Sequence, residues 1–383
     1  MQRLDSVATI TLGQAPPGES YNTEGDGWPL IAGAGDFKEG VAAPKKYTTK
    51  PSKLSCPGDI ILGIRASIGE KVISDKEYCL GRGVASLRPN ERINIRYLWN
   101  WLGFSSGDLA AKGKGATFKQ VNSKHIAEMM IPVPSLDEQR RIAEALDQVD
   151  ALREKRQKSI TLLDDLTQSV YHEMFLGSTA PAPVRNVSDV CSVVIDCVNK
   201  TAPTVDYETD YKMIRTTNIK NGIVSTQSVR FVVESTFKAW TKRVRPIPDD
   251  VILTREAPVG EAGILKESDN LFLGQRLMLY RADPDYLTPE YLLATLRSDA
   301  LRHQYWAGSS GSTVKHLPVA VCRNLSIPTP ALSEQIEFSD RIRALRSTKD
   351  SAQTQLHHLD TLLASIQSRA FRSELWQDDV KDL

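Results

Sequence analysis

The sequence of 383 residues lacks any apolar run of the ~18 residues that a membrane-spanning helix needs. Its start, residues 1–5, is polar and has neither the basic end nor the apolar core of a secretory signal. The five cysteines include no CxxC pair, which argues against a disulfide scaffold and against a zinc site. We therefore expect a cytoplasmic protein with reduced thiols and no membrane partner.

Catalytic motifs are missing as well. The sequence has no HExxH pair, no EF-hand loop and no GxSxG elbow. The glycines of residues 33–40 have the wrong spacing for a dinucleotide-binding turn, and residues 113–117 lack the order of a phosphate loop. Asp59 together with residues 70–71 suggests a nuclease, but the Glu-x-Lys order of such metal sites is absent. The sequence thus predicts no catalytic residue, no metal site and no cofactor in this chain.

Charge is unevenly distributed along a chain whose net charge is only +1. Residues 1–134 carry a net charge of +4 and residues 178–331 carry +2, while the remaining residues carry −5. A polyanion would be attracted to the two basic segments and repelled by the acidic remainder. The partition agrees with a nucleic-acid partner, although a few charges per segment also arise by chance.

The chain repeats itself at an offset of 196 residues. Residues 115–119 (GATFK) match residues 311–315 (GSTVK), and residues 131–139 (IPVPSLDEQ) match residues 327–335 (IPTPALSEQ). The register then holds without a gap as far as Phe175 and Phe371. A register kept over such a length indicates an internal duplication.

Earlier in each half the match persists, but the offset drifts as loop insertions would make it drift. The offset is 191 between residues 57–62 (PGDIIL) and 248–253 (PDDVIL), and 193 between the Leu-Gly pairs at 80–81 and 273–274. Residues 15–50 and 200–247 align only loosely. Two similar frames with different loops would recognise two different ligands.

Two long helices follow the two basic segments. Residues 136–175 contain neither Gly nor Pro and carry apolar residues at helical spacing. Ser135 with Glu138 predicts a capping box, and Gly177 is placed to end the first helix. The second helix follows Ala331, which is a poorer cap, and runs to about Phe371. A helix of forty residues spans ~60 Å.

A long helix with one apolar face is not stable alone. We expect the two helices to pair as an antiparallel coiled coil. This pairing would relate the two globular domains by a pseudo-two-fold axis and would hold them apart. The alternative is that each helix folds back onto its own domain.

The basic segments combine strands and helices without strict alternation, which is typical of α+β or mixed-sheet domains. The predicted strands are residues 59–65, 84–88, 250–255 and 277–281, and the predicted helices are residues 95–104 and 289–304. Trp99 and Trp101 are expected in the core.

The predicted fold class is therefore α+β, with two mixed α/β domains separated by two helical arms in an internal repeat. The domains are residues 1–134 and 178–331. The arms are residues 135–177 and residues 332–383, the second including the C-terminal tail.

Two groups of side chains could contact nucleic acid. Hydroxyl and ammonium groups in Gly-rich loops suit phosphates, and they are Lys112, Lys114, Thr117 and Lys119 with the second-copy residues Ser309, Ser310, Ser312, Thr313 and Lys315. Arg and Gln side chains near strand ends can bond guanine or adenine in pairs, and they are Arg65, Arg82, Arg255, Gln275 and Arg276. A turn shared by descent would explain the first group equally well, and surface salt bridges would explain the second.

Three duplicated elements are specific enough to suggest a family. They are Pro-x-Asp-[Ile/Val]-Ile-Leu at 57–62 and 248–253, the [Ile/Val]-Gly-Glu turns at 68–70 and 259–261, and Pro-x-Pro-x-Leu-x-Glu-Gln at 132–139 and 328–335. With these elements, the chain resembles the specificity (S) subunit of type I restriction–modification systems over essentially its whole length.

The resemblance implies that each globular domain is a target-recognition domain for one half of a bipartite, asymmetric site in double-stranded DNA. The helices would set the spacer between the halves and bind two modification (methyltransferase) subunits. S-adenosylmethionine, ATP and Mg²⁺ would be used by those subunits and by restriction (translocase/endonuclease) subunits. Glu138, Gln139, Glu334 and Gln335 are then junction or partner contacts. Two other hypotheses stay open, namely a coiled-coil interaction scaffold without DNA specificity and a self-sufficient enzyme such as a nuclease.

Overall fold

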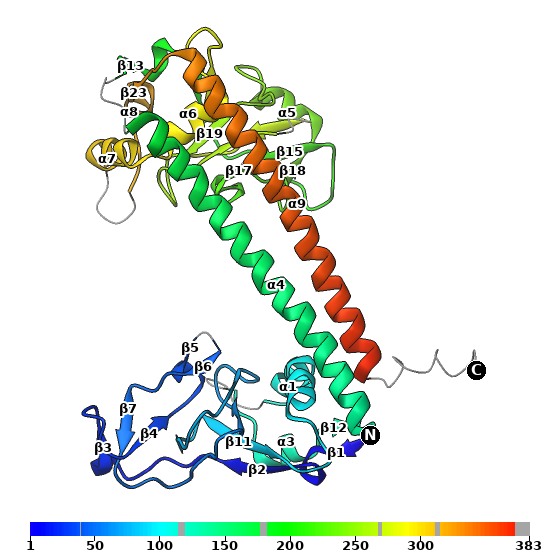
Figure 1. The fold of residues 1–383 in the computed structure, drawn as a ribbon. Coiled ribbons are helices and arrows are strands. Elements are labelled where there is room, and N and C mark those ends of the chain that lie inside the picture. The colour runs from blue at the N-terminus through cyan, green and yellow to red at the C-terminus, as the bar shows by residue number, and fades with distance from the viewer. Residues whose placement is uncertain (39, 114–118, 177–181, 267–269, 311–314, 372–383) are drawn as a thin grey trace, which may run out of the picture. The chain divides into compact units, whose positions relative to one another are not determined.

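The computed structural model describes residues 1–38, 40–113, 119–176, 182–266, 270–310 and 315–371 (Figure 1). Its contacts divide the chain into two units. Unit 1 combines Met1–Gln157 with Thr354–Leu383, and unit 2 is Lys158–Gln353. Each unit therefore contains one globular part and a segment of each long helix.

The main sheet of unit 1 is antiparallel, with the strand order β2-β11-β8-β9. Its strands are β2 (Ala8–Leu12), β11 (Val84–Pro89), β8 (Ile60–Gly63) and β9 (Lys71–Ile73). The sequence predicts the central strands β8 and β11, whose apolar, β-branched residues are buried, and it misses β2 and β9. Side chains of β2, β8 and β11 share one core with Tyr97 and Trp101 of helix α1 (Ile95–Phe104).

The remaining strands of unit 1 are short. A second sheet has the order β10-β4-β7-β3, in which β10 runs parallel to β4. These strands are β10 (Cys79–Leu80), β4 (Trp28–Ile31), β7 (Lys46–Thr48) and β3 (Tyr21–Asn22). Two further pairs join β1 (Gln2–Arg3) to β12 (Met130–Ile131) and β5 (Phe37–Lys38) to β6 (Val41–Ala42). The helices of this part are α1 (Ile95–Phe104), α2 (Ser106–Ala111) and α3 (Ser123–Ala127).

Unit 2 repeats this plan with a larger main sheet, ordered β14-β22-β19-β20-β17-β16. Its strands are β14 (Cys191–Asp196), β22 (Leu277–Ala282), β19 (Val251–Thr254), β20 (Ala262–Ile264), β17 (Gly222–Val224) and β16 (Ile219–Lys220). The second sheet is β18 (Arg230–Val232), β15 (Tyr211–Ile214) and β21 (Leu271–Leu273), and a further pair joins β13 (Val184–Asn186) to β23 (Ser326–Pro328). The first four strands of the main sheet correspond in order to β2-β11-β8-β9.

The helices of unit 2 correct one prediction. They are α5 (Glu234–Trp240), α6 (Pro289–Leu296), α7 (Asp299–Gly308) and α8 (Val319–Arg323). The single helix predicted over residues 289–304 is wrong, because it is divided between α6 and α7. The break occurs at Ser298, whose extended backbone and side-chain bond to the Leu301 amide begin a new helix.

The duplication is visible in individual hydrogen bonds. The hydroxyl of Tyr97 donates to the Pro132 carbonyl at 3.0 Å, and the hydroxyl of Tyr291 donates to the Pro328 carbonyl at 3.0 Å. The two tyrosines lie at the same place in α1 and α6, and they tie these helices to the segment before each long helix. Positions in α1 therefore align with those in α6 at an offset of 194.

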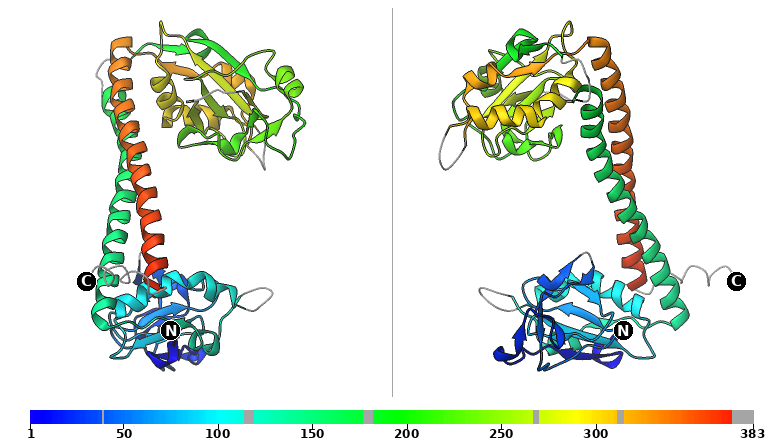
Figure 2. Two further views of the ribbon diagram at one scale, coloured as in Figure 1. Left: turned by 90° about the vertical axis from the view of Figure 1, so that its right-hand side faces the viewer. Right: turned by 60° about the vertical axis from the view of Figure 1, so that its left-hand side comes forward.

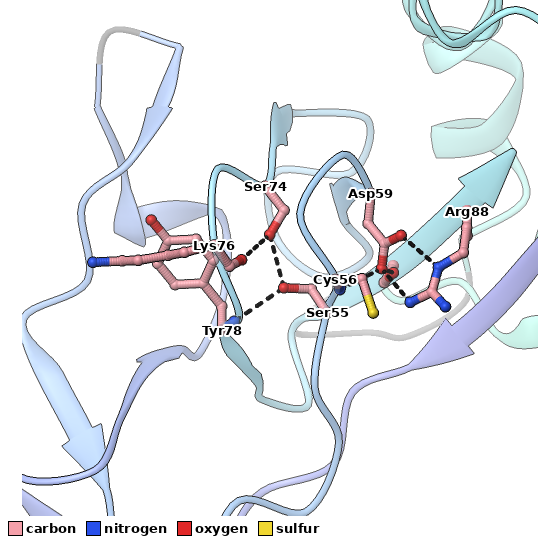
Figure 3. A network of polar contacts seen from close by, with 8 residues as sticks. Ser55, Cys56, Asp59, Ser74, Lys76, Tyr78 and Arg88 are labelled. Atoms are coloured by element: carbon pink, nitrogen blue, oxygen red, sulfur yellow. Dashed lines mark hydrogen bonds and ion pairs between the residues drawn. The ribbon is translucent and has the colours of Figure 1, made fainter.

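The aspartate of the Pro-x-Asp element has a structural role in both units. Asp59 is buried and accepts hydrogen bonds from Arg88, from the Ser86 hydroxyl and from the Cys56 amide (Figure 3). In unit 2, buried Asp250 pairs with Arg281 at 2.8 Å in the same way. Both aspartates fasten the start of a central strand to its neighbour, which accounts for them without any catalytic role.

The long helices are α4 (Leu136–Tyr171), which continues as a π-helical turn over His172–Leu176, and α9 (Leu332–Phe371). The capping box predicted at the first helix is present, since Ser135 and Glu138 bond each other through side chain and backbone. At the second helix only the Ala331 amide bonds Glu334, at 3.2 Å. The predicted end of the first helix, Gly177, lies outside the described residues.

In unit 1 the start of α4 and the end of α9 pair antiparallel, and the two views of Figure 2 show them side by side. Arg153 of α4 bonds Asp360 of α9 at 2.6 Å. Beyond this pair, Phe371 is buried against Tyr97 and Phe104 of α1.

Unit 2 contains the repeat-related contacts between the end of α4 and the start of α9. Lys349 bonds Asp164, which are the positions 196 residues away from Arg153 and Asp360 in the opposite order. Phe175 packs between Tyr291 and Phe338, with ring centroids 4.8 and 5.4 Å away. The antiparallel pairing is thus confirmed in each unit. The alternative that each helix folds back only onto its own domain is wrong, because the end of each helix completes the other globular part.

Candidate nucleic-acid interface

A cleft opens in unit 1 where three chain segments meet. They are residues 32–35 after β4, residues 65–67 after β8 and residues 81–83 before β11. The Gly81 amide donates to the Ile31 carbonyl at 2.8 Å, and the Gly83 amide donates to the Ala32 carbonyl at 2.9 Å. A β-carbon at Gly81 would lie 2.8 Å from the Ala32 α-carbon, so only glycine permits this approach. The close backbone packing explains the duplicated Leu-Gly pair as a structural feature.

Two of the predicted DNA-binding residues, Arg65 and Arg82, come together in this cleft. Arg82 is exposed and Arg65 is half-buried. Among the residues that the structure describes, neither has an ion-pair partner, and the buried Nε of Arg65 has no hydrogen-bond acceptor. Unpaired guanidinium groups in a concave site suit phosphate oxygens or the O6 and N7 acceptors of guanine.

The corresponding cleft of unit 2 lies between β15, β19 and β22. Its lining includes Arg215, Gln275 and Arg276. The Gly274 amide donates to the Ile214 carbonyl at 2.8 Å, which repeats the contact made by Gly81. Gln275 and Arg276 therefore occupy the same place in the repeat as Arg82 and Gly83, at the offset of 193.

The chemistry of the second cleft differs from that of the first. Glu256 stands where the first cleft has Arg65. It pairs with Arg276 at 3.0 Å, and its other carboxylate oxygen lies 2.7 Å from Nδ1 of His316. Gln275 offers an amide where the first cleft has the guanidinium of Arg82. The first cleft thus carries surplus positive charge, whereas the second combines a carboxylate, an amide and guanidinium groups, a donor and acceptor set suited to different base edges.

Arg255 has a different environment from the other predicted residues. Its side chain is buried, with Nε donating to the Leu317 carbonyl at 2.8 Å and a terminal nitrogen 3.1 Å from Nε2 of His316. The guanidinium fastens the chain after residue 315 to the end of β19. A residue in this position can orient the cleft.

The Gly-rich loops begin and end beside the clefts. The backbone of Gln120, at the end of the first loop, forms an isolated β-bridge with the backbone of Arg65. At the second loop, the backbones of Ser310 and His316 bond each other. The exposed or half-exposed loop residues are Lys112, Lys119, Ser309, Ser310 and Lys315. Lys114, Thr117, Ser312 and Thr313 lie outside the described residues. Among the described residues, the first loop therefore supplies Lys112 and Lys119 and ends beside Arg65, while the second supplies Ser309, Ser310 and Lys315.

The sequence matches the family model of the type I restriction modification DNA specificity domain over residues 1–162 and 183–360. The chain belongs to this family. Each matched segment contains one of the two clefts and most of one long helix.

Individual relatives of the specificity-domain family agree with this assignment. The chain is 32% identical to the type I restriction enzyme MjaX specificity subunit of Methanocaldococcus jannaschii over 44% of this chain and 40% of that protein. It is 24% identical to the EcoBI specificity subunit of Escherichia coli over 99% of this chain and 87% of that protein. The crystal structure of an S subunit from M. genitalium has the same fold, with a TM-score of 0.61 and 14% identity over 97% of this chain and 95% of the other.

In this specificity-domain protein, two buried glutamines fasten each long helix to its globular part. Gln139 accepts from the Asn94 amide at 2.7 Å and donates to the Arg92 carbonyl at 3.0 Å. Gln335 accepts from the Thr288 amide at 3.1 Å and donates to the Tyr286 carbonyl at 2.9 Å. Glu138 and Glu334 bond the backbone at the helix starts. The Glu-Gln pair thus lies at the junction of domain and helix in both units.

No group of three His, Cys, Asp or Glu side chains that could hold a metal ion occurs in the part of the chain that the structure describes. A search of the same residues finds no helix long and apolar enough to cross a membrane. All five cysteines are free thiols. The residues that sequence analysis missed are Arg215, Glu256 and His316. For Glu256 the signal was its alignment with Arg65 of the other copy, whereas Arg215 lies in a segment that aligns only loosely.

Proposed function

We propose that this chain is the DNA sequence-recognition subunit of a type I restriction–modification complex. It has two target-recognition domains, residues 1–134 and residues 178–331. Each domain binds one half of a bipartite, asymmetric site in double-stranded DNA. The observation that carries this proposal is that one cleft is built twice, at the same place in the fold, with different polar side chains.

The proposed mechanism divides the contacts into two kinds. Arg65 and Arg82 in unit 1, with Gln275 and Arg276 in unit 2, contact base edges in the major groove. Lys112, Lys114, Thr117 and Lys119, with Ser309, Ser310, Ser312, Thr313 and Lys315, position the phosphate backbone. Arg255 orients the second cleft through its hydrogen bond to the Leu317 carbonyl.

The arms, residues 135–177 and 332–383, set the spacer between half-sites and bind two modification subunits. Their exposed apolar side chains support a protein partner, since Leu152 is 51% and Leu162 66% exposed. The junction residues Glu138, Gln139, Glu334 and Gln335 hold each domain on its arm.

The chain itself is proposed to be non-catalytic. Methyl transfer with S-adenosylmethionine belongs to the modification subunits, and ATP- and Mg²⁺-dependent chemistry belongs to the restriction subunits. This division agrees with the structural roles of Asp59 and Asp250, whose carboxylates are held by arginines.

Sequencing the methylated bases of a host that carries this chain with its modification subunits tests the proposal. We expect one bipartite motif with two different halves. Exchanging residues 178–331 for the equivalent segment of a relative should change one half only. A single continuous motif, loss of both halves on exchange, or affinity for duplex DNA that does not fall with salt would contradict the proposal, the last favouring a protein-binding scaffold.

A further inference from the structure

Unit 2 contains a cavity away from the proposed DNA-binding cleft. The cavity lies between α4, α6 and α9, beside the turn that leads into β17. Its apolar lining includes Leu293, Phe338 and Ile342. A volume of about 150 Å³ is well above the ~10–15 Å³ that one water molecule needs. The cavity can therefore hold a small ligand.

The carboxylates that line this cavity are already paired. Glu290 bonds Arg343 at 2.9 Å, and Asp164 bonds Lys349. Asp350 bonds Lys266 at 3.0 Å. These pairs neutralise the acidic part of the lining.

Two further cations line the cavity, Arg297 of the α6 end and Arg346 of α9. Neither guanidinium has a hydrogen-bond or ion-pair partner among the residues described by the structure. Both side chains are partly buried, and burial lowers the pKa of both groups. The carboxylates of Glu290, Asp249 and Asp350 act to raise the pKa of Arg346, and the positive charge of Arg297 adds a smaller lowering. Among the described residues, the cavity thus holds two guanidinium groups that no carboxylate contacts directly.

The first copy of the repeat has neither arginine at the matching positions, and the ammonium of one lysine, Lys71, lies beside Gly103 instead. Gly103 aligns with Arg297 at the offset of 194, and Asp150 aligns with Arg346 at the offset of 196. In unit 1 the ammonium of Lys71 lies 4.5 Å over the ring of Trp99, which aligns with Leu293 of the cavity. The pairing of the long helices is therefore achieved without these arginines, and their presence in unit 2 calls for another explanation.

We propose that this cavity binds a phosphate-type oxyanion through Arg297 and Arg346. Planar guanidinium groups form paired, charge-assisted hydrogen bonds with phosphate oxygens. A dianion would compensate two positive charges at once. The phosphate is either free or carried by a nucleotide, and both sources share the same chemistry at the arginines. This site is separate from base recognition and occurs in one half of the chain only.

Isothermal titration calorimetry of the full chain with inorganic phosphate and with adenosine monophosphate, at ionic strength balanced by NaCl, tests the site. We expect saturable binding of at least one of them. Arg297→Gln and Arg346→Gln should each weaken it at least about tenfold. Arg341→Gln is the matched control, because Arg341 is an exposed residue of α9 that pairs with Glu337 outside the cavity lining. It should keep the wild-type affinity.

Arg346→Lys guards against a folding artefact, because it keeps the charge, and should bind more tightly than Arg346→Gln. Binding of phosphate alone identifies the free anion, and tighter binding of adenosine monophosphate identifies a nucleotide. Absence of saturable binding by either ligand, or equal affinity in wild type and both Gln variants, overturns the proposal.

Discussion

Arg96 of α1 forms a two-pronged ion pair with Asp147 of α4, through two hydrogen bonds of 2.8 Å. At the aligned positions of unit 2 the charges are exchanged, because Glu290 of α6 pairs with Arg343 of α9 at 2.9 Å. At this junction the globular part of unit 1 carries the positive charge and α4 the negative one, while the globular part of unit 2 carries the negative charge and α9 the positive one. Pairing either globular part with the wrong helix start would bring like charges together. The exchange favours the correct domain–helix pairing and disfavours the incorrect one.

Charge reversal at this junction should be rescued by its partner. Arg96→Glu places two carboxylates together and should lower the free energy of unfolding by roughly 1–2 kcal/mol. The double variant Arg96→Glu/Asp147→Arg recreates the arrangement of unit 2 and should recover most of the loss. Urea unfolding of the wild type, both single variants and the double variant measures the coupling.

Removal of Arg343 should cost more than removal of Arg96. Glu290 is only 4% exposed, whereas the Asp147 side chain is 31% exposed and can be hydrated. Arg343→Ala leaves a buried carboxylate without its cation, at a cost of roughly 2–4 kcal/mol. Equal destabilisation by Arg343→Ala and Arg96→Ala would contradict this account.

Truncation of the aromatic residue at each helix end should destabilise the unit in which that end is packed. Phe371→Ala removes a ring that is 5% exposed and should cost unit 1 about 3–5 kcal/mol. Phe175→Ala should act on unit 2 instead. Hydrogen exchange followed by mass spectrometry locates the loss of protection. Leu162→Ala, at an exposed helix position, is the control and should change stability by less than about 0.5 kcal/mol.

Substitutions in the two clefts should affect different half-sites. Arg82→Ala should relax base preference in one half, and Gln275→Ala in the other, each by about 1–3 kcal/mol, or roughly 5- to 150-fold. Selection from randomised duplexes measures both halves at once. Lys124→Ala, an exposed cation outside the cleft lining, serves as the control. A change in both halves caused by one substitution would refute separate recognition.

Lysines of the Gly-rich loops should act on affinity and leave specificity unchanged. Lys119→Ala and Lys315→Ala should weaken binding uniformly across sequences. Each should also reduce the steepness of the salt dependence by about one unit, because one phosphate contact is lost. Binding isotherms between low and moderate salt check this, and a sequence-dependent effect would reassign these lysines to base contacts.

The pair formed by Asp59 and Arg88 should contribute to acid sensitivity. Burial acts to raise the pKa of Asp59, but hydrogen bonds from Arg88, Cys56 and Ser86 outweigh it and hold that pKa below its usual value. A carboxylate with a lowered pKa stabilises the fold above its unfolded pKa of ~3.9, and this contribution disappears as the pH falls through the folded value. Asp59→Asn should therefore flatten the dependence of stability on pH below about 4. An unchanged profile in acid unfolding experiments would be inconsistent with this role.

The features that depend on local periodicity were predictable from the sequence. Apolar spacing and capping residues predict the long helices. Apolar runs between Pro, Gly and Asp predict the central strands. The strands β4 and β15 were missed because they are short and are held by partners far away in the sequence.

The candidate site was only partly predictable, because it depends on which loops converge. Arg65, Arg82 and Arg255 all lie near strand ends in the sequence. Of these three, only Arg65 and Arg82 line a cleft. The burial of Arg255 depends on a carbonyl at Leu317, sixty-two residues later, and no local pattern reveals it.

Phe371 completes the core of unit 1, although it lies far along the 383-residue sequence from the rest of that core. During translation the N-terminal globular part leaves the ribosome long before this ring is made, since chains grow at roughly 5–20 residues per second. Until Phe371 is synthesised, the surface beside Tyr97 that its ring covers stays exposed. A stop codon just before position 371 would therefore destabilise the N-terminal globular part, although that part is synthesised first.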